Sequence, residues 1–201
     1  MVWSTIVGVP LGILGAVRRD SIFDRVGKFI ALIGQSAPPF WIGIMLIFFF
    51  AVRFEWLPPT GREDFKSIIL PAITLGWWFV AVNMRLIRSA MLDVLDSEYI
   101  KLARAKGASQ RSIIWKHALK NALIPALTFG GISLGSMVTG SVVVELVFAW
   151  PGLGRLAVQS MYTSDYPVLQ GVVIIFTLLY LTSALLVDIL YAYIDPRIRY
   201  A

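Results

Sequence analysis

The sequence predicts an all-α protein: a polytopic bundle of transmembrane helices with a short helix in one cytoplasmic loop. The first observation is composition, because 58% of the 201 residues are hydrophobic and the mean hydropathy is +0.76. Soluble domains are usually about 45–50% apolar. The second is that the apolar residues form long runs separated by charged segments. The third is that lysine and arginine gather in alternate segments, which sets the orientation of the runs in a membrane.

The apolar runs are interpreted as five membrane spans, each approaching the roughly 20 residues that cross a bilayer. They cover about residues 1–17, 29–52, 68–87, 121–148 and 168–193. The first carries Gly8, Gly12 and Ala16, a spacing of small residues that suits close helix packing. The second contains Pro38 and Pro39, which remove two backbone donors and break or kink a helix. We expect this break to face protein or a cavity rather than lipid.

The basic segments fix the predicted topology. Residues 18–34, 85–120 and 197–199 carry the lysine and arginine excess and are predicted to be cytoplasmic. The loops 53–67 and 149–167 are then external, and the C-terminus is cytoplasmic. An external N-terminus on a first span is unusual, so we expect a sixth, preceding helix to be missing; a genuine five-span protein is the alternative. Residues 1–201 are interpreted as a single transmembrane domain.

Several kinds of chemistry are disfavoured by the residues present. The chain has no cysteine and one histidine, which excludes disulfides, cysteine-ligated metals and multi-histidine metal sites. It has no G-x-x-x-x-G-K-[ST] motif, so it does not itself bind ATP in a P-loop. Ser133 stands in the sequence GISLG at 131–135, which matches the G-x-S-x-G pattern of a nucleophile elbow. The match lies inside an apolar run and not at a strand-to-helix turn, which disfavours an intramembrane hydrolase. The basic residues flank apolar spans, which favours a membrane-side loop over nucleic-acid binding.

The strongest functional signal is the basic segment Ser97–Pro125. Residues 97–106 are good helix formers, and Gly107 stands where a helix end needs a left-handed residue. On this helix Ile100, Ala103 and Gly107 are predicted to share one smooth face that a partner protein could approach closely. The alternative is an amphipathic linker held by anionic lipid.

An acidic residue inside an apolar run is a functional candidate by default. Glu145 lies near the external end of its span, just before the sequence FAWPGLG. It could bind a cationic group of a passing substrate, or it could accept hydrogen bonds from the backbone of that turn; we favour the second role. The candidate residues for a translocation path or gate are Pro38, Pro39, Gly135 and Glu145.

The order of residues in 103–109 (ARAKGAS) and 116–125 (KHALKNALIP) resembles the cytoplasmic EAA loop of bacterial ABC importer permeases, in the dipeptide/oligopeptide/nickel branch. The general pattern has Glu-Ala-Ala six residues before its glycine, whereas this chain has Lys-Leu-Ala at 101–103, as the peptide branch does. The likeness covers nearly the whole chain in collinear order. Four further stretches agree: GVPLG at 8–12 with Arg18-Arg19; SAPPFWIG at 36–43; VVVE at 142–145 with FAWPGLG at 148–154; and DYPVLQG at 165–171 with Asp195-Pro196-Arg197.

The resemblance implies a permease subunit that forms the translocation path of an ATP-driven importer in the bacterial or archaeal inner membrane. It implies peptides or a related small solute, with nickel among the candidates, as substrate. It also implies a second permease subunit, two cytoplasmic ATPase subunits that use ATP and Mg²⁺, and an extracytoplasmic substrate-binding protein as partners. A self-contained secondary transporter or channel is the alternative. By resemblance, the residues that dock on the ATPase are Glu98, Tyr99, Ile100, Lys101, Ala103, Arg104, Ala105 and Gly107.

Overall fold

The computed structural model describes residues 1–194, and within them it leaves the side chains of 132, 134–136, 138–140, 188 and 190–194 undescribed. The described part of the chain is helical and contains no strand, which confirms the all-α prediction. In chain order its elements are α1 (Val2–Val17), α2 (Ile22–Ser36), α3 (Pro39–Leu46), the π segment η1 (Ile47–Arg53), the 3₁₀ turn η2 (Phe65–Ile68), α4 (Ile69–Leu95), α5 (Glu98–Ala105), α6 (Gln110–Ser112), the π segment η3 (Ile113–Ala118), α7 (Leu119–Val147), α8 (Leu153–Tyr162) and α9 (Tyr166–Ile194).

The helices group into two compact units, and each unit is built from two separate stretches of sequence. Unit 1 consists of Met1–Ser36 and Gly76–Gly130, and unit 2 consists of Ala37–Leu75 and Gly131–Ala201. The boundaries fall inside α4 and α7, so each of these helices contributes to both units. The single transmembrane domain over residues 1–201 stays a prediction.

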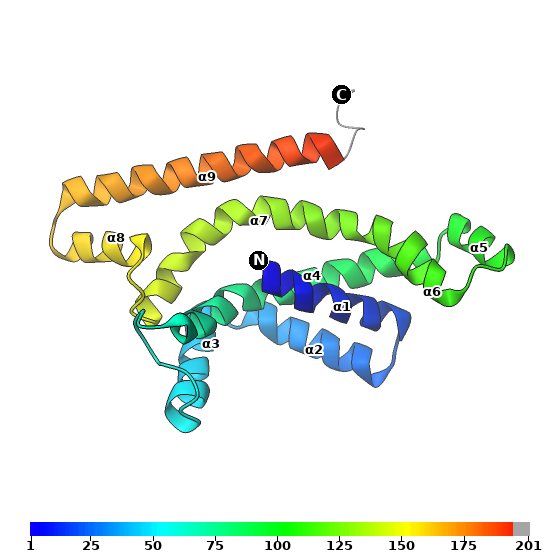
Figure 1. Cartoon of the computed structure of the whole chain (residues 1–201), viewed down its shortest axis with the longest axis horizontal. Helices are drawn as coiled ribbons and strands as arrows, with labels where there is room; N and C mark the ends of the chain where they lie inside the picture. The colour runs from blue at the N-terminus through cyan, green and yellow to red at the C-terminus, as the bar shows by residue number, and fades with distance from the viewer. Residues whose placement is uncertain (195–201) are drawn as a thin grey trace. The chain divides into compact units, whose positions relative to one another are not determined.

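Unit 1 is held together by close packing of α1 and α2 on α4, and Figure 1 shows α1 and α2 side by side. A Cβ atom added at Gly8 would lie 2.9 Å from the Val80 carbonyl oxygen, and one at Gly12 would lie 2.7 Å from that of Met84. Only glycine lets two helix backbones come this close. Together with Ala16, which is 4% exposed, these residues form the small-residue face that the sequence predicted.

The main core of unit 1 lies where α4, α5, η3 and the start of α7 meet. Its fully buried side chains include Ile87 and Met91 of α4, Ile100 of α5 and Ile113 of η3. The small residues Ala118 and Ala122 also belong to it, together with Ile13 and Ala16 of α1 and Ala126 of α7. This core fixes the position of α5, because α5 is too short to be a stable helix on its own.

Unit 2 has a smaller core, formed by Leu70, Val144 and Phe148. Gly43 of α3 packs on it, because a Cβ there would lie 3.1 Å from Val147 and 3.2 Å from Phe148. The segment between η1 and η2 is joined to the end of α7 by one backbone hydrogen bond. The Gly61 N–H donates to the Phe148 carbonyl oxygen at 2.9 Å. In Figure 1, α8 and α9 lie side by side in this unit.

The helices that carry the predicted second span over 29–52, with its break at the two prolines, have different bounds from that span. The helix begins earlier, at Ile22, ends at Ser36 and resumes at Pro39, and the two halves are bent by 110°. Pro38 is the N-cap of α3 with extended backbone angles and Pro39 occupies its first turn, the position where proline is tolerated. The expected break at the two prolines is therefore confirmed, although the bend is sharper than a kink.

The helix that carries the predicted third span is longer than that span, because α4 continues from Ile69 to Leu95 and does not stop near 87. Arg85 and Arg88, assigned to a loop by their charge, lie on this helix. Its continuation is favoured by Ile87 and Met91, which are fully buried in the unit 1 core. The loop 149–167, predicted to be external, also contains an unpredicted helix, α8. In contrast, α1, α7 and α9 match the predicted spans within two residues.

Two helical stretches in the described residues are long and apolar enough to cross a bilayer, Phe65–Leu95 and Tyr166–Val187. The bent pair of α2 with α3 and η1 makes a third if it is counted as one broken span. The helix α1 is apolar but shorter, with 16 residues. The number of five spans stays a prediction.

Candidate functional site

The predicted coupling helix is α5, and its two ends are defined by local chemistry. Ser97 occupies the N-cap position, but its hydroxyl donates to the Val94 carbonyl and does not accept from α5. At the other end Gly107 has φ +80°, which confirms the expected left-handed residue. The Ala108 N–H donates to the Ala103 carbonyl at 3.1 Å and the Gly107 N–H to the Arg104 carbonyl at 2.9 Å, the two bonds of a Schellman motif.

One residue of the predicted docking face of α5 is not accessible, because Ile100 points into the core of unit 1 and is 0% exposed. It packs with Met91, Ile113 and Ala118. Ala103 is half-buried on the same side. The physical reason is that α5 has to bury an apolar side chain to be held in place, and Ile100 is the residue that does so. The face carrying Ile100 and Ala103 is therefore turned to the chain's own core.

The outward face of α5 consists of Glu98, Lys101, Leu102 and Ala105, all of which are exposed. At about 100° per residue these four positions lie within about one third of the helix circumference, opposite Ile100. Leu102 is 57% exposed, although it is apolar. Leu102 was not among the residues predicted from the sequence. It stands two positions after Ile100, and a helix places residues at this spacing on opposite sides. An apolar residue at that position could therefore have indicated an exposed contact.

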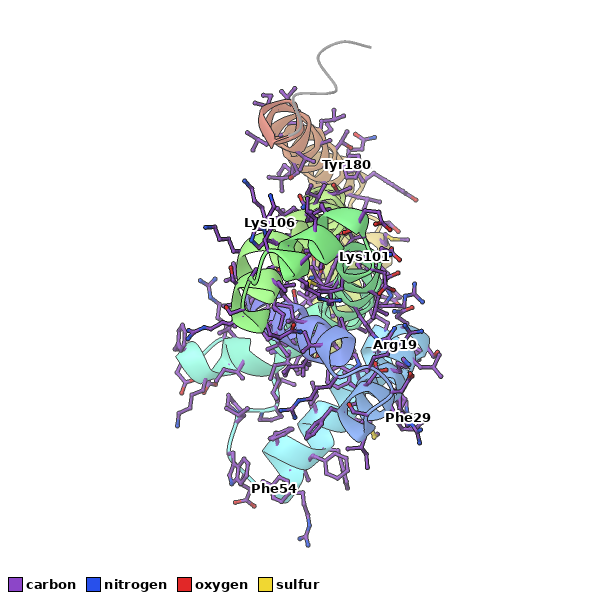
Figure 2. The ribbon with its side chains drawn as sticks, turned by 90° about the vertical axis from the view of Figure 1, so that its right-hand side faces the viewer. Arg19, Phe29, Phe54, Lys101, Lys106 and Tyr180 are labelled. Atoms are coloured by element: carbon purple, nitrogen blue, oxygen red, sulfur yellow. The ribbon has the colours of Figure 1, made fainter. Side chains whose placement is uncertain are left out.

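The charges on this face are solvated. Lys101 Nζ lies 2.8 Å from Glu98 Oε1, but both side chains are more than half exposed, and such pairs contribute little to stability. Arg104, Lys106 and Gly107 are also exposed. Figure 2 views this end of unit 1, where the labelled Lys101 and Lys106 side chains project from the ribbon of α5 and its C-terminal turn. The outward face thus offers one apolar side chain surrounded by charge.

The segment after α5 begins as expected and then departs from a regular helix. Ser109 caps α6, since its hydroxyl accepts from the Ser112 N–H at 3.3 Å. The next residues form the π segment η3, a wide turn that often marks a functional position. Tyr99 of α5 reaches this region: its hydroxyl accepts from Asn121 Nδ2 at 2.8 Å and donates to the His117 carbonyl at 3.4 Å.

A buried ion pair was missed by the sequence analysis. Asp24, in the first turn of α2, is fully buried and lies 2.5 Å from Arg88 Nε and 2.9 Å from Arg88 Nη2. Lys28 approaches the same carboxylate at 2.9 Å, and the Asp20 N–H donates to it at 3.1 Å. This carboxylate therefore joins α2, α4 and the turn after α1. The sequence showed only that Asp24 has a lysine, Lys28, four positions later. The arginine that pairs with Asp24, Arg88, is 64 residues away in the sequence.

Glu145 takes the structural role that was favoured for it. Its carboxylate accepts from the Arg155 N–H at 3.0 Å and from the Ser141 hydroxyl at 2.8 Å. The first bond places a negative charge at the N-terminus of α8, where the helix dipole favours it. A Cβ added at Gly152 would lie 2.4 Å from this carboxyl group, so the glycine makes room for it. A role for Glu145 in the translocation path stays a prediction.

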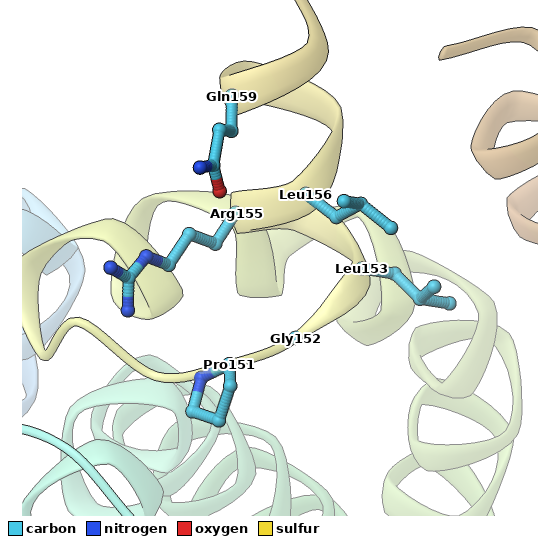
Figure 3. Close-up of a pocket in the computed structure, with 6 residues that line it drawn as sticks. All are labelled: Pro151, Gly152, Leu153, Arg155, Leu156 and Gln159. Carbon is cyan, nitrogen blue, oxygen red and sulfur yellow. The ribbon is translucent and has the colours of Figure 1, made fainter. Parts of the chain in front are cut away.

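The first turns of α8 line an open cavity of about 570 Å³ in unit 2. Its walls are Pro151 and Gly152 in the preceding turn and Leu153, Arg155, Leu156 and Gln159 on α8 (Figure 3). The Arg155 guanidinium donates to the Ala149 carbonyl, which ties α8 to the preceding turn. The cavity is therefore next to the Glu145 turn.

The other residues predicted for a translocation path are Pro38, Pro39 and Gly135. Pro38 and Pro39 form the break between α2 and α3, and a role in a path is not tested by their geometry. Gly135 lies in α7, at a position whose surroundings are outside those that the structure describes.

Comparisons with known proteins give a consistent picture. The family described as "Binding-protein-dependent transport system inner membrane component" matches residues 8–200. The glutathione transport system permease protein GsiC of Escherichia coli (strain K12) is 46% identical over 200 residues, which cover 100% of this chain and 65% of that protein. GsiC of Salmonella choleraesuis (strain SC-B67) is 45% identical over the same shares. The chain spans about 65% of the length of these curated relatives.

A solved structure shares the fold. A chain of the MetNI methionine ABC transporter, in an inward-facing conformation, superposes with a TM-score of 0.78. The superposition covers 96% of this chain and 88% of that one, at 22% sequence identity. At this identity the likeness shows the fold alone, and it confirms the predicted class of a helical membrane subunit.

Proposed function

Because the chain belongs to the family of binding-protein-dependent transport system inner membrane components, we propose that it is a membrane-spanning permease subunit of an ATP-driven importer. The observation that carries the proposal is the family match over residues 8–200, nearly the whole chain. In this role the chain contributes to the translocation path and has no ATPase site. Separate subunits bind ATP and Mg²⁺ and supply the energy.

The partners in this proposal are a second permease subunit, identical or different, two cytoplasmic ATPase subunits and an extracytoplasmic binding protein. Membership in a family of binding-protein-dependent transport components supports the last of these. The chain lies in the inner membrane, with α5 and its C-terminus in the cytoplasm. The alternation of basic and neutral connecting segments supports this orientation.

The proposed substrates are short peptides, with glutathione as the best-supported member of the class. The support is the name of the relatives that are 45–46% identical to this chain. Nickel, suggested by the branch that the sequence resembles, is the second candidate.

The outward face of α5 is the proposed contact with the ATPase. Leu102 is its only aliphatic side chain beyond alanine among Glu98, Lys101, Leu102 and Ala105, and it is 57% exposed. An exposed leucine surrounded by charge is suited to a shallow apolar groove with a charged rim. Because Ile100 anchors the opposite side in the core, a displacement of this face acts on the core of unit 1.

Replacement of Leu102 by aspartate is expected to reduce retention of the ATPase about tenfold or more in detergent pull-down. The reason is that a carboxylate forced into an apolar groove costs at least about 1.4 kcal/mol, a factor of ten in affinity. The stability of the chain is expected to be unchanged within about 0.5 kcal/mol, because the side chain is on the surface.

The matched control is Phe65→Asp, which places the same charge on a side chain that is 86% exposed in the predicted external segment. Phe65→Asp should retain the ATPase as the unaltered chain does. Equal retention by both variants and the unaltered chain would show that Leu102 is not in the contact, and failure of the unaltered chain to retain any ATPase would remove the importer proposal itself.

A further inference from the structure

The short helix α5 has two described side-chain attachments to the rest of unit 1. One is Ile100, which is fully buried in the core. The other is Tyr99, whose hydroxyl lies 2.8 Å from Asn121 Nδ2 in the first turn of α7. On a helix these neighbouring residues point about 100° apart, and half-buried Ala103 lies between them. The two attachments therefore resist rotation of α5 about its own axis, which Ile100 alone would not prevent.

The place where Tyr99 attaches is the least regular part of the α5–α7 connection. The π segment η3 ends at Ala118, and the Leu119 N–H reaches back to the Ile114 carbonyl. Pro125 lies inside α7 and has no N–H to donate to the carbonyl of Asn121, four residues before it. A helix interrupted by a wide turn and by a proline bends more easily than a regular one. Asn121 sits between these two interruptions.

The three polar groups at this point form a closed set. Asn121 Nδ2 donates to the Tyr99 hydroxyl at 2.8 Å and approaches the His117 carbonyl at 3.5 Å, while the Tyr99 hydroxyl donates to that carbonyl at 3.4 Å. The short bond is the strong one, and the two longer contacts orient it. The set is partly open to water, since Tyr99 is 42% exposed. Its contribution to global stability is therefore small, and its effect is on the relative position of two helices.

We propose that Tyr99 is a positioning residue, and not a docking residue: through Asn121 and the His117 carbonyl it fixes α5 to the softened start of α7, so that the two helices move as one body. The inference rests on the proposed function in one respect, since that function supplies the movement of α5. In an importer, this connection sets how much of an ATPase-driven displacement of α5 reaches α7. Without it, α5 can turn around its Ile100 anchor while α7 stays in place.

Hydrogen exchange on the complete chain in nanodiscs tests the connection directly. The exchange rates of the α5 backbone amides are compared among the unaltered chain, Tyr99→Phe, Asn121→Ala and the double variant. Each single variant is expected to exchange about fivefold faster, which corresponds to about 1 kcal/mol at 1.4 kcal/mol per factor of ten. The double variant is expected to be no faster than either single one, because one connection can be lost only once.

The control is Tyr162→Phe, which removes a hydroxyl from a side chain that is 87% exposed on α8. It should leave exchange in α5 unchanged. Unchanged rates in both single variants, or a double variant that is about 25-fold faster because the effects multiply, would overturn the proposal.

A second measurement separates this inference from the proposed function. In proteoliposomes with the ATPase and the binding protein, Tyr99→Phe should retain the ATPase but move about fivefold fewer substrate molecules per ATP. Loss of ATPase binding in Tyr99→Phe, with Asn121→Ala behaving as the unaltered chain, would return Tyr99 to the docking surface. If the unaltered chain moves no substrate, the proposed function fails, while the exchange rates still decide whether Tyr99 joins α5 to α7.

Discussion

Replacing Asp24 by alanine is expected to destabilise the protein by about 3 kcal/mol or more, because it leaves the Arg88 guanidinium without its main partner. Asp24 is 0% exposed and the Arg88 side chain is 18% exposed, so water compensates the arginine only in part. Three parts of unit 1 meet at this carboxylate: α2, α4 and the turn that carries Asp20. The measurement is the free energy of unfolding in a reversible SDS titration, followed by the fluorescence of the seven tryptophans.

The double variant Asp24→Ala with Arg88→Met is the test of the mechanism. It should be more stable than Asp24→Ala alone, since it removes the uncompensated charge as well. Glu98→Gln is the matched control, because Glu98 is in an ion pair with Lys101 but its side chain is 89% exposed. That change should cost less than about 0.5 kcal/mol. A double variant that is no more stable than the single one would mean that the burial of Arg88 is not what makes Asp24 necessary.

Replacing Gly12 by alanine is expected to destabilise the protein by about 1–3 kcal/mol, although alanine is the better helix former. The added methyl group would lie 2.7 Å from the Met84 carbonyl oxygen and 2.8 Å from the Ile87 Cβ. One neighbour is backbone and the other is a β-branched side chain in the core, so neither can move away easily. The expected result is separation of α1 from α4, measured as a lower free energy of unfolding.

The same substitution at Gly171 is the control. Gly171 lies inside α9 and a Cβ there has no heavy atom within 4 Å. Gly171→Ala should therefore be neutral or stabilising, by up to about 1 kcal/mol from helix propensity alone. If both variants were equally stable, the close approach of α1 and α4 would not be a stabilising feature of unit 1.

The features that could be predicted from the sequence are those set by local chemistry. The break at Pro38 and Pro39 follows from two missing N–H donors, and the end of α5 follows from the left-handed backbone that Gly107 allows. The small face of α1 follows from residues spaced four apart. Each of these depends on neighbours in sequence, so no knowledge of the fold was needed.

The features that could not be predicted depend on partners distant in sequence. The direction of Ile100 is set by the position of Met91 and Ala118. A short helix with Ile100 and Leu102 on opposite sides gives no sign of which of the two faces the core. Arg88 was assigned to a loop by its charge, and its ion pair with Asp24 was missed because the two residues are 64 positions apart. For the candidate site, the helix itself was predicted correctly, but Ile100 was expected on its accessible face and is buried, and the exposed Leu102 was not among the predicted residues.

The most direct test of the central claim, that the outward face of α5 contacts an ATPase, is a photo-crosslinking scan of residues 98–107. The chain has no cysteine, so a thiol-directed photoreactive group can be placed at one position at a time. We expect crosslinks to the ATPase from cysteines at the exposed positions Lys101, Leu102 and Ala105. A cysteine at Ile100, which is 0% exposed, should crosslink within the chain instead. Crosslinks to the ATPase from position 100 with none from position 102 would contradict the assignment of the two faces, and the absence of any ATPase crosslink along α5 would contradict the coupling role.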